Sequence, residues 1–292
     1  MTYRSILKIA DLSMAEIDGI LARARELLGG AVASSPRAQR VIGLVFLEES
    51  LRTRVGFNVA AARLGWSSVE VIERRDGPTT SPESLRDTLR TVAGYADVLV
   101  LRAGEPLDGR LTDALPAGVI NGGDRGVDAE HPSQALIDLF AIEEFAGPIG
   151  NLHVAVCGDP TMRAARSLLR LLSRRAPGQL SIIAAPGASA ESMLPSTFGK
   201  PPELRTLRDV ADVDVLYVAG IPHDALPLGV RSELLVDAHA LDRLPPGAVV
   251  VSPLPVIDEI AVEIRVAPKV RIFEQSDLGL FVRMALLEFV VG

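Results

Sequence analysis

The chain has 292 residues, nearly half of them hydrophobic, and a formal net charge of −7. This length suits two domains of roughly 150 residues each, and the acidic charge argues against non-specific binding to nucleic acid, whose phosphates attract basic surfaces. Cys157 is the only cysteine, which excludes an intrachain disulfide and a Cys-rich metal site. The first residues lack the apolar core of a signal peptide, and no stretch reaches the about 18 apolar residues that span a bilayer. We therefore expect a cytoplasmic protein.

Short apolar runs alternate with helix-length periodic segments through most of the chain, a pattern typical of β–α units around parallel sheets. In the first half we expect strands at 41–47, 68–72, 97–102 and 117–121, and helices at 50–64, from about 82 with Ser81 as N-cap, and from His131. The run 146–150, Ala-Gly-Pro-Ile-Gly, then interrupts both helix and strand and is the best candidate for a domain boundary.

The same rhythm restarts after this boundary. We expect strands at 152–157, 180–184, 214–218 and 248–252, a helix from about 162, and a last helix at 277–290. The last helix is apolar on most faces, so we expect it to be buried and to pack back on the first domain. The chain is thus predicted to be an α/β protein with a first domain of residues 1–146 plus 277–292 and a second of 147–276.

The segment 46–54, FLEESLRTR, follows a strand and opens a helix. Ser50, Arg52 and Thr53 there would offer an anion two kinds of side-chain donor, beside free backbone N–H groups and a favourable helix dipole. The alternative is an ordinary capped helix with solvated arginines.

Arg102 lies at the carboxyl end of a strand, where open parallel sheets bind their ligands, although a surface arginine is equally common there. His131 and Gln134 are three residues apart and so share a helix face. His131 could polarise a carbonyl oxygen and Gln134 could accept from an amide NH2. A single histidine near a helix start is more often structural.

Two segments of the second half carry similar signals. The run 157–167, CGDPTMRAARS, lacks G-x-G-x-x-G, so a dinucleotide site is only weakly indicated, but Arg163 and Arg166 lie where a carboxylate could bind. The run 252–260, SPLPVIDEI, follows a strand, and its prolines keep carbonyl groups while lacking N–H donors, so this loop can present acceptors to an NH2 group.

Taken in order, these segments resemble the aspartate/ornithine carbamoyltransferase family from about residue 40 to the end, with a plausible N-terminal helix before them. FLEESLRTRVGF is similar to the family's phosphate segment F-x-E-x-S-T-R-T-R-x-S-F, HPSQALIDL to H-P-T-Q-A-L-L-D, and PLPVIDEI to P-L-P-R-x-D-E-I. ESLRDT, GDPTMRAARS, DVLYVAGIP and FVRMALL match further blocks.

The resemblance implies two Rossmann-like, three-layer domains with parallel sheets in each chain. It also implies that three copies of the chain form a homotrimer. It implies carbamoyl phosphate in the first domain and an amino-acid-like acceptor in the second. The implied reaction is attack by an amine on the carbamoyl carbon and then loss of phosphate. Catalysis of this kind depends on positioning and electrostatic stabilisation, with no metal and no organic cofactor.

Residue roles follow from the resemblance position by position. Ser50, Arg52 and Thr53 would hold the phosphate. Arg102 and His131, again with Thr53, would polarise the carbonyl oxygen.

The remaining roles concern the NH2 group and the acceptor. Gln134 and the backbone of Pro253 and Leu254 would hold the carbamoyl NH2. Arg163 would bind the α-carboxylate of the acceptor, and Glu48 would help to orient arginines across the domain cleft.

Departures from the family pattern are concentrated in the substrate pocket: Leu51 for Thr, Gly77 for Ser, Ser81 for Lys, Gly220 for Arg, Pro222 for Gln, Ser252 for His and Val256 for Arg. Because each charge-assisted hydrogen bond contributes roughly 1.5–3 kcal/mol, losing several of them lowers the rate by orders of magnitude unless other residues replace them. The candidates for replacement are Arg74, Arg75, Arg125 and Arg166.

Three functions remain open at this point. The first is a carbamoyltransferase whose acceptor is not aspartate and lacks its side-chain carboxylate. The second is a catalytically impaired paralogue that assembles with an active subunit or binds a ligand. The third is an unrelated nucleotide-binding oxidoreductase on a similar fold, although this sequence lacks the glycine fingerprint of that class. Within the family the ornithine branch is disfavoured, because 219–223 and 252–256 show no acceptor motif of that kind.

Overall fold

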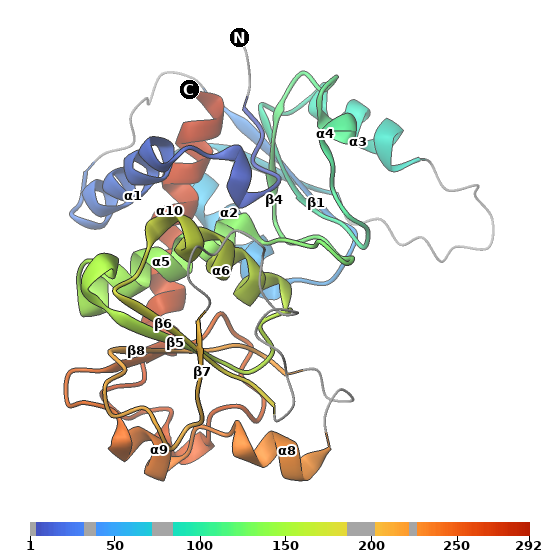
Figure 1. Cartoon of the computed structure of the whole chain (residues 1–292). Coiled ribbons are helices and arrows are strands. Elements are labelled where there is room, and N and C mark those ends of the chain that lie inside the picture. Colours follow the sequence, from blue (N-terminus) through green and yellow to red (C-terminus); the bar gives the residue numbers. More distant parts are fainter. Residues whose placement is uncertain (1–3, 32–38, 72–83, 186–201, 222–226) are drawn as a thin grey trace. The chain divides into compact units, whose positions relative to one another are not determined.

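The computed structural model describes residues 4–31, 39–71, 84–185, 202–221 and 227–292. The chain divides into two compact units, unit 1 with Met1–Leu136 and Gly279–Gly292, and unit 2 with Ile137–Leu278. Each unit contains one parallel β-sheet with helices packed against it (Figure 1). This confirms the predicted α/β class with two parallel-sheet domains.

Unit 1 contains a four-stranded parallel sheet in the order β2-β1-β3-β4. Its strands are β1 (Val41–Phe46), β2 (Ser67–Val71), β3 (Val98–Arg102) and β4 (Gly118–Asn121). Its helices are η1 (Ile9–Asp11), α1 (Met14–Leu28), α2 (Leu51–Arg63), α3 (Leu85–Ala93), α4 (Gly109–Thr112) and the start of α5 (Pro132–Ala146). The four strands lie where the sequence predicts them.

The sheet of unit 1 is covered on both faces, which is why β3 and β4 read as continuous apolar runs. On one face Val45 and Leu99 pack with Leu89 of α3. On the other face Gly118 lies directly against Val290, near the carboxyl end of the last helix, so no larger residue fits there.

Unit 2 contains a five-stranded parallel sheet in the order β7-β6-β5-β8-β9. Its strands are β5 (His153–Cys157), β6 (Gln179–Ile183), β7 (Glu203–Leu204), β8 (Val215–Val218) and β9 (Val249–Val251). Its helices are η2 (Ile149–Asn151), α6 (Arg163–Arg175), α8 (Leu228–Glu233), α9 (Ala238–Arg243), η3 (Val262–Ile264) and the start of α10 (Ile272–Val291). The sequence did not predict β7, α8 or α9.

The two faces of the unit 2 sheet are also covered. Leu216 and Val250 point to the face that packs with Leu234 and Leu241, at the end of α8 and within α9. Tyr217 points to the opposite face, where its hydroxyl donates to Asp138 of α5 at 2.9 Å. Figure 1 shows α5 and α6 on one side of this sheet and α8 and α9 on the other.

The division between the units falls after Leu136, within α5, rather than at the predicted run 146–150. Helix α5 continues without a break to Ala146, and its second half packs with unit 2. There Glu143 pairs with Arg175 at 3.5 Å, and Phe145 stacks under the guanidinium of Arg271 at 4.7 Å. Tertiary contacts, not the Gly-Pro run, therefore decide to which unit this helix segment belongs.

Two helix starts also differ from the prediction. Ser81 and Pro82 lie outside the described residues, and α3 begins at Leu85 with Ser84 as its N-cap, whose hydroxyl accepts the Asp87 N–H at 3.1 Å. The last helix, α10, begins at Ile272 rather than near residue 277. Its carboxyl-terminal part belongs to unit 1, where Glu288 pairs with Arg23 at 2.7 Å.

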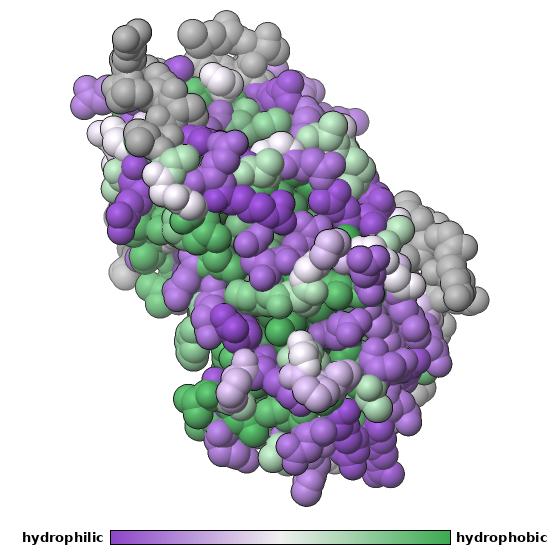
Figure 2. Space-filling view, turned by 90° about the vertical axis from the view of Figure 1, so that its left-hand side faces the viewer, coloured by the Kyte–Doolittle hydropathy of each residue, from purple (hydrophilic) through white to green (hydrophobic). Residues whose placement is uncertain are grey.

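Hydrophobic side chains reach the surface among polar ones on the face drawn in Figure 2. On α2, Leu51, Val55 and Val59 are exposed and spaced four residues apart, so they form an apolar stripe along one side of the helix. Among the helices that the structure describes, none is long and apolar enough to cross a membrane.

Candidate active site

Three neighbouring strands of unit 1 end at the same edge of the sheet, because the sheet is parallel. Arg102 is the last residue of β3 and lies beside Phe46 of β1, and Asn121 ends β4 beside Leu101. Glu48 follows β1 by two residues. This carboxyl edge is where open parallel sheets bind ligands, and it carries most of the predicted site residues.

Arg102 and His131 converge on Gly123 at this edge. A Cβ atom on Gly123 would lie 2.8 Å from Arg102 Nη1 and 2.9 Å and 3.3 Å from His131 Cδ2 and Nε2. Arg102 Nη1 also donates to the carbonyl oxygen of Gly122 at 3.0 Å. Gly123 has φ +106, a conformation that side chains disfavour, so glycine is required here for both conformation and space.

Thr53, in the first turn of α2, lies beside Gly122, the residue before Gly123. A Cβ on Gly122 would lie 3.3 Å from Thr53 Cγ2, and Thr53 itself is buried. The three side chains predicted to polarise a carbonyl oxygen, those of Thr53, Arg102 and His131, therefore surround the pair Gly122–Gly123.

His131 is positioned by the start of α5. Its carbonyl oxygen accepts the N–H groups of Gln134 and Ala135 at 3.0 and 3.1 Å. Its Nδ1 lies 3.2 Å from Ser133 Oγ. When the Ser133 hydroxyl donates to Nδ1, Nε2 carries the proton and can donate to an oxygen atom near Gly123. Gln134 follows on the same turn and is half-buried.

The amino end of α2 has the properties of an anion site. Ser50 is the N-cap residue in an extended conformation, and its side chain makes no capping hydrogen bond. The Arg52 side chain reaches the surface, but protein atoms around it displace part of its hydration, which lowers the pKa of the guanidinium. A helix amino end that adds a hydroxyl and a guanidinium to its N–H groups favours a bound oxyanion. Leu51 between them is 69% exposed and adds no polar group.

The loop from β4 to α5 is held by buried polar side chains. Asn121 Oδ1 accepts the N–H of Gly123 at 2.8 Å, which fixes the turn at which Arg102 and His131 meet. Asp124 Oδ1 accepts the Glu130 N–H at 2.7 Å, and Glu130 Oε2 accepts the Ile9 N–H at 2.9 Å. These three side chains are almost fully buried, so the loop is firmly anchored.

Glu48 pairs with an arginine of its own unit. Its Oε1 atom lies 2.5 Å from Arg125 Nε, and its carboxylate also lies against Gly104 after β3. The sequence predicts Glu48 to orient arginines across the domain cleft and offers Arg125 as one of four arginines that could replace lost donors, without pairing the two. The contact joins the ends of β1 and the β4–α5 loop, which no local sequence signal indicates.

In unit 2, Arg163 is the first residue of α6 and follows β5 at the carboxyl edge of that sheet. The turn before it requires glycine, since Gly158 has φ +113 and packs directly on the Ala219 carbonyl. Asp159 Oδ1 accepts both the N–H and the hydroxyl of Thr161, at 2.8 and 2.7 Å. Arg163 thus stands at a helix amino end, as the sequence predicts.

A buried network holds the start of the loop that carries Pro253 and Leu254. The Ser252 N–H donates to Gln275 Oε1 at 2.7 Å, and Gln275 Nε2 donates to Asp138 Oδ1 at 2.6 Å. Sequence reasoning missed this role of Asp138. The available signal was a single carboxylate within the apolar run 135–142 of this helix.

The surroundings of Gly220 contain no cation among the nearest described atoms. The atoms closest to a Cβ on Gly220 are Glu259 Oε1 at 3.8 Å and Met162 Cε at 4.0 Å. Glu259 is buried and accepts the N–H groups of Ile221 and Ile257 at 3.1 and 2.8 Å. Pro222 lies outside the described residues.

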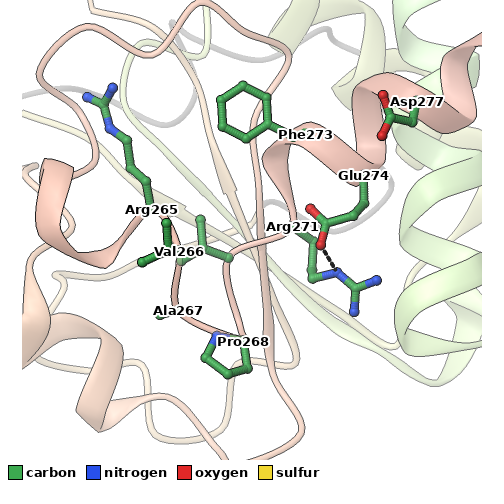
Figure 3. A pocket seen from close by; sticks show the side chains of 9 residues that line it. Arg265, Val266, Ala267, Pro268, Arg271, Phe273, Glu274 and Asp277 are labelled. Carbon is green, nitrogen blue, oxygen red and sulfur yellow. Dashed lines mark ion pairs between the residues drawn. The ribbon is translucent and has the colours of Figure 1, made fainter.

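A surface hollow of about 630 Å³ in unit 2 contains none of the predicted site residues. It is lined by Arg265–Pro268, Val270, Arg271, Phe273, Glu274 and Asp277. Arg271 is paired there with Glu274 at 3.0 Å, as Figure 3 shows, and Arg265 donates to the carbonyl of Ile257 at 2.9 Å. Both arginines of this hollow are thus engaged within the protein.

Within the described ranges, no group of three or more His, Cys, Asp or Glu side chains could hold a metal ion. Cys157 is fully buried, and burial raises the pKa of its thiol to about 12. This thiol is therefore neutral and inert as a nucleophile.

Together these features define a class: an α/β protein of two parallel-sheet units, with arginine, histidine and hydroxyl side chains gathered at the carboxyl edge of the first sheet. Residues 4–144 match the model for the carbamoyl-P binding domain of aspartate/ornithine carbamoyltransferases. The aspartate carbamoyltransferase catalytic subunit of Halorubrum lacusprofundi is 34% identical, over 100% of this chain and 96% of that one. The chain belongs to the aspartate/ornithine carbamoyltransferase family.

Solved structures agree with this assignment. The catalytic subunit of M. jannaschii aspartate transcarbamoylase matches with a TM-score of 0.85 and 29% identity, over 99% of this chain and 98% of that one. Aspartate transcarbamoylase from Trypanosoma cruzi, solved with carbamoyl aspartate and phosphate, matches with a TM-score of 0.86 and 26% identity, over 100% and 97%.

Proposed function

We propose that the chain transfers a carbamoyl group from carbamoyl phosphate to the amino group of an amino-acid-like acceptor. The observation that carries the proposal is the convergence of Thr53, Arg102 and His131 on Gly122–Gly123, next to the amino end of α2. Relatives along the whole chain are aspartate carbamoyltransferases, which supports this reaction class.

In this reaction the amine nitrogen forms a bond to the carbamoyl carbon, and negative charge develops on the carbonyl oxygen. Arg102 Nη1 and His131 Nε2 donate to that oxygen from the positions they hold around Gly123. The bond between the carbamoyl carbon and the bridging oxygen then breaks, phosphate leaves with that oxygen and the electron pair, and the amine proton passes to phosphate or solvent. Removing one such donor typically lowers kcat by about 10²–10³.

The phosphate group would bind at the amino end of α2. The Ser50 hydroxyl is not used as a cap, and Arg52 adds a guanidinium within the same turn. Carbamoyl phosphate is an anion with three acceptor oxygens on phosphorus, which suits a set of N–H and O–H donors near a positive helix end.

Acceptor recognition would use Arg163 for the α-carboxylate, and the carbamoyl NH2 would be held by Gln134 and the carbonyls of Pro253 and Leu254. Gly220 has no side chain that could bind a second carboxylate, and Arg231, which donates to the neighbouring Ile221 carbonyl at 3.3 Å, is already paired with Asp258. This supports an acceptor without the side-chain carboxylate of aspartate.

We propose further that the chain forms a homotrimer. The apolar stripe of Leu51, Val55 and Val59 on α2 supports self-association, because a run of exposed hydrophobic residues is unfavourable in a lone soluble chain. Light scattering coupled to gel filtration measures the mass directly. A monomer at micromolar concentration would contradict the trimer.

A second candidate is a paralogue that binds carbamoyl phosphate without turnover. The exposed, apolar Leu51 between Ser50 and Arg52 favours it, since this position adds no donor for the phosphate. Such a protein would bind carbamoyl phosphate in calorimetry and act with a partner subunit.

One experiment separates the two candidates. The purified chain is incubated with carbamoyl phosphate and with aspartate, ornithine or neutral amino acids, and phosphate and carbamoylated product are measured above the enzyme-free rate. We expect acceptor-dependent product that persists in EDTA. Binding of carbamoyl phosphate without product for any acceptor would support the second candidate, and neither binding nor product would overturn both.

A further inference from the structure

Arg125 lies in the β4–α5 loop, two residues beyond Gly123, the point where Arg102 and His131 meet. Its side chain is 67% exposed, yet its Nε atom is only 2.5 Å from Glu48 Oε1. Glu48 in turn precedes Ser50 by two residues on the segment that joins β1 to α2. Arg125 therefore presents a guanidinium beside the segment predicted to bind phosphate.

The loop that carries Arg125 is rigidly built. On its amino-terminal side Asp124 is 2% exposed and accepts the N–H groups of Leu107 and Glu130. On its carboxyl-terminal side Glu130 is 1% exposed and accepts the N–H of Ile9. An exposed arginine on an anchored loop loses little backbone freedom when it binds a ligand, which favours binding.

The pair with Glu48 is a weak competitor for a substrate anion. The Glu48 side chain is 16% exposed, but solvent reaches and screens the pair from the Arg125 side, which is 67% exposed. A phosphoryl or carboxylate group accepts two parallel hydrogen bonds from one guanidinium, which is the stronger arrangement. Arg52 and Arg102 belong to the same edge and add to its positive potential, in a protein whose net charge is −7.

We propose that Arg125 is a substrate-binding residue that takes an oxyanion, phosphoryl or carboxylate, of one of the two substrates, while Glu48 holds its guanidinium at the site between turnovers. The proposal rests on the carbamoyl transfer proposed above. The sequence offers Arg125 only as one of four arginines that could replace lost donors, and its pair with Glu48, far away in the chain, places it beside the predicted phosphate segment.

The test compares steady-state kinetics of wild type, Arg125→Gln, Arg125→Lys and the control Val127→Ala, an apolar residue of the same loop that is 95% exposed. We expect Arg125→Gln to raise the KM of one substrate about tenfold or more, the effect of one lost charge-assisted hydrogen bond. Its kcat should change less than about threefold, and Arg125→Lys should recover part of the loss. The control should match wild type.

Measuring the KM of each substrate separately shows which substrate carries the oxyanion that Arg125 binds. A raised KM for carbamoyl phosphate assigns Arg125 to the phosphoryl group, and a raised KM for the acceptor assigns it to a carboxylate. Unchanged values for both substrates in an active enzyme, or the same change in Val127→Ala, would overturn the inference alone. A wild-type chain with no turnover would overturn the proposed function and this inference with it.

Discussion

Replacing Gly123 by alanine disturbs the convergence of Arg102 and His131 without touching either side chain. The new Cβ would lie 2.8 Å from Arg102 Nη1 and 2.9 Å from His131 Cδ2, closer than a side-chain carbon approaches such atoms, so both groups must shift. Alanine at φ +106 also strains the backbone by about 1–3 kcal/mol. We expect kcat to fall about a hundredfold or more, the usual effect of displacing oxyanion donors.

Gly65→Ala is the matched control. Gly65 has φ +74 in the same unit, but nothing lies within 4 Å of a Cβ built there, so this variant keeps the backbone strain and lacks the collision. Both variants should unfold at a lower temperature, by about 2–4 °C for each kcal/mol of strain. Initial rates at saturating substrate, measured beside thermal unfolding, separate the effects. If Gly123→Ala kept a kcat within twofold of Gly65→Ala, the two donors would not act from their positions around Gly123.

Three further outcomes follow from the structure. Arg52→Gln should raise the KM of carbamoyl phosphate about tenfold or more and leave that of the acceptor nearly unchanged in initial-rate assays, because the guanidinium serves the phosphate; equal effects on both substrates would contradict this. Tyr217→Phe should lower the free energy of unfolding in urea by about 1–3 kcal/mol, since buried Asp138 loses the donor now at 2.9 Å; an unchanged midpoint would argue against the network. Burial raises the pKa of Cys157 from 9.0 to about 12, so the thiol ionises first in the unfolded chain and its contribution lowers stability as pH rises above about 9. Thiol reagents at pH 8 should therefore label Cys157 only after denaturation, and rapid labelling of the folded protein would contradict its burial.

The strands of both sheets could be predicted because their apolar runs are local signals. Val41–Phe46 and Val98–Arg102 are apolar almost throughout and are bounded by polar segments. Strand β7 has only Glu203 and Leu204, both exposed, and carries no such pattern. The start of α10 was missed because four polar residues, 274–277, separate Ile272 and Phe273 from the long apolar run. Gln275 is buried there with hydrogen bonds to Ser252 and Asp138.

The candidate site likewise has a part that local sequence signals indicate and a part that depends on tertiary contacts. Thr53, Arg102 and His131 stand at strand ends and helix starts, so the parallel topology alone brings them to one edge. The pairing of Glu48 with Arg125 depends on how two loops fold toward each other, and residue spacing does not encode it. The substrate-binding and catalytic roles of all these residues, and those of Gln134, Arg163, Pro253 and Leu254, stay predictions.

A crystal structure with a phosphonacetyl amino acid, a stable analogue that joins the two substrates, tests the central claim most directly. We expect its carbonyl oxygen about 3 Å from Arg102 Nη1, His131 Nε2 and Thr53 Oγ1, with its phosphonate at the amino end of α2. An analogue bound elsewhere, or one whose carbonyl oxygen touches none of these three side chains, would contradict the account.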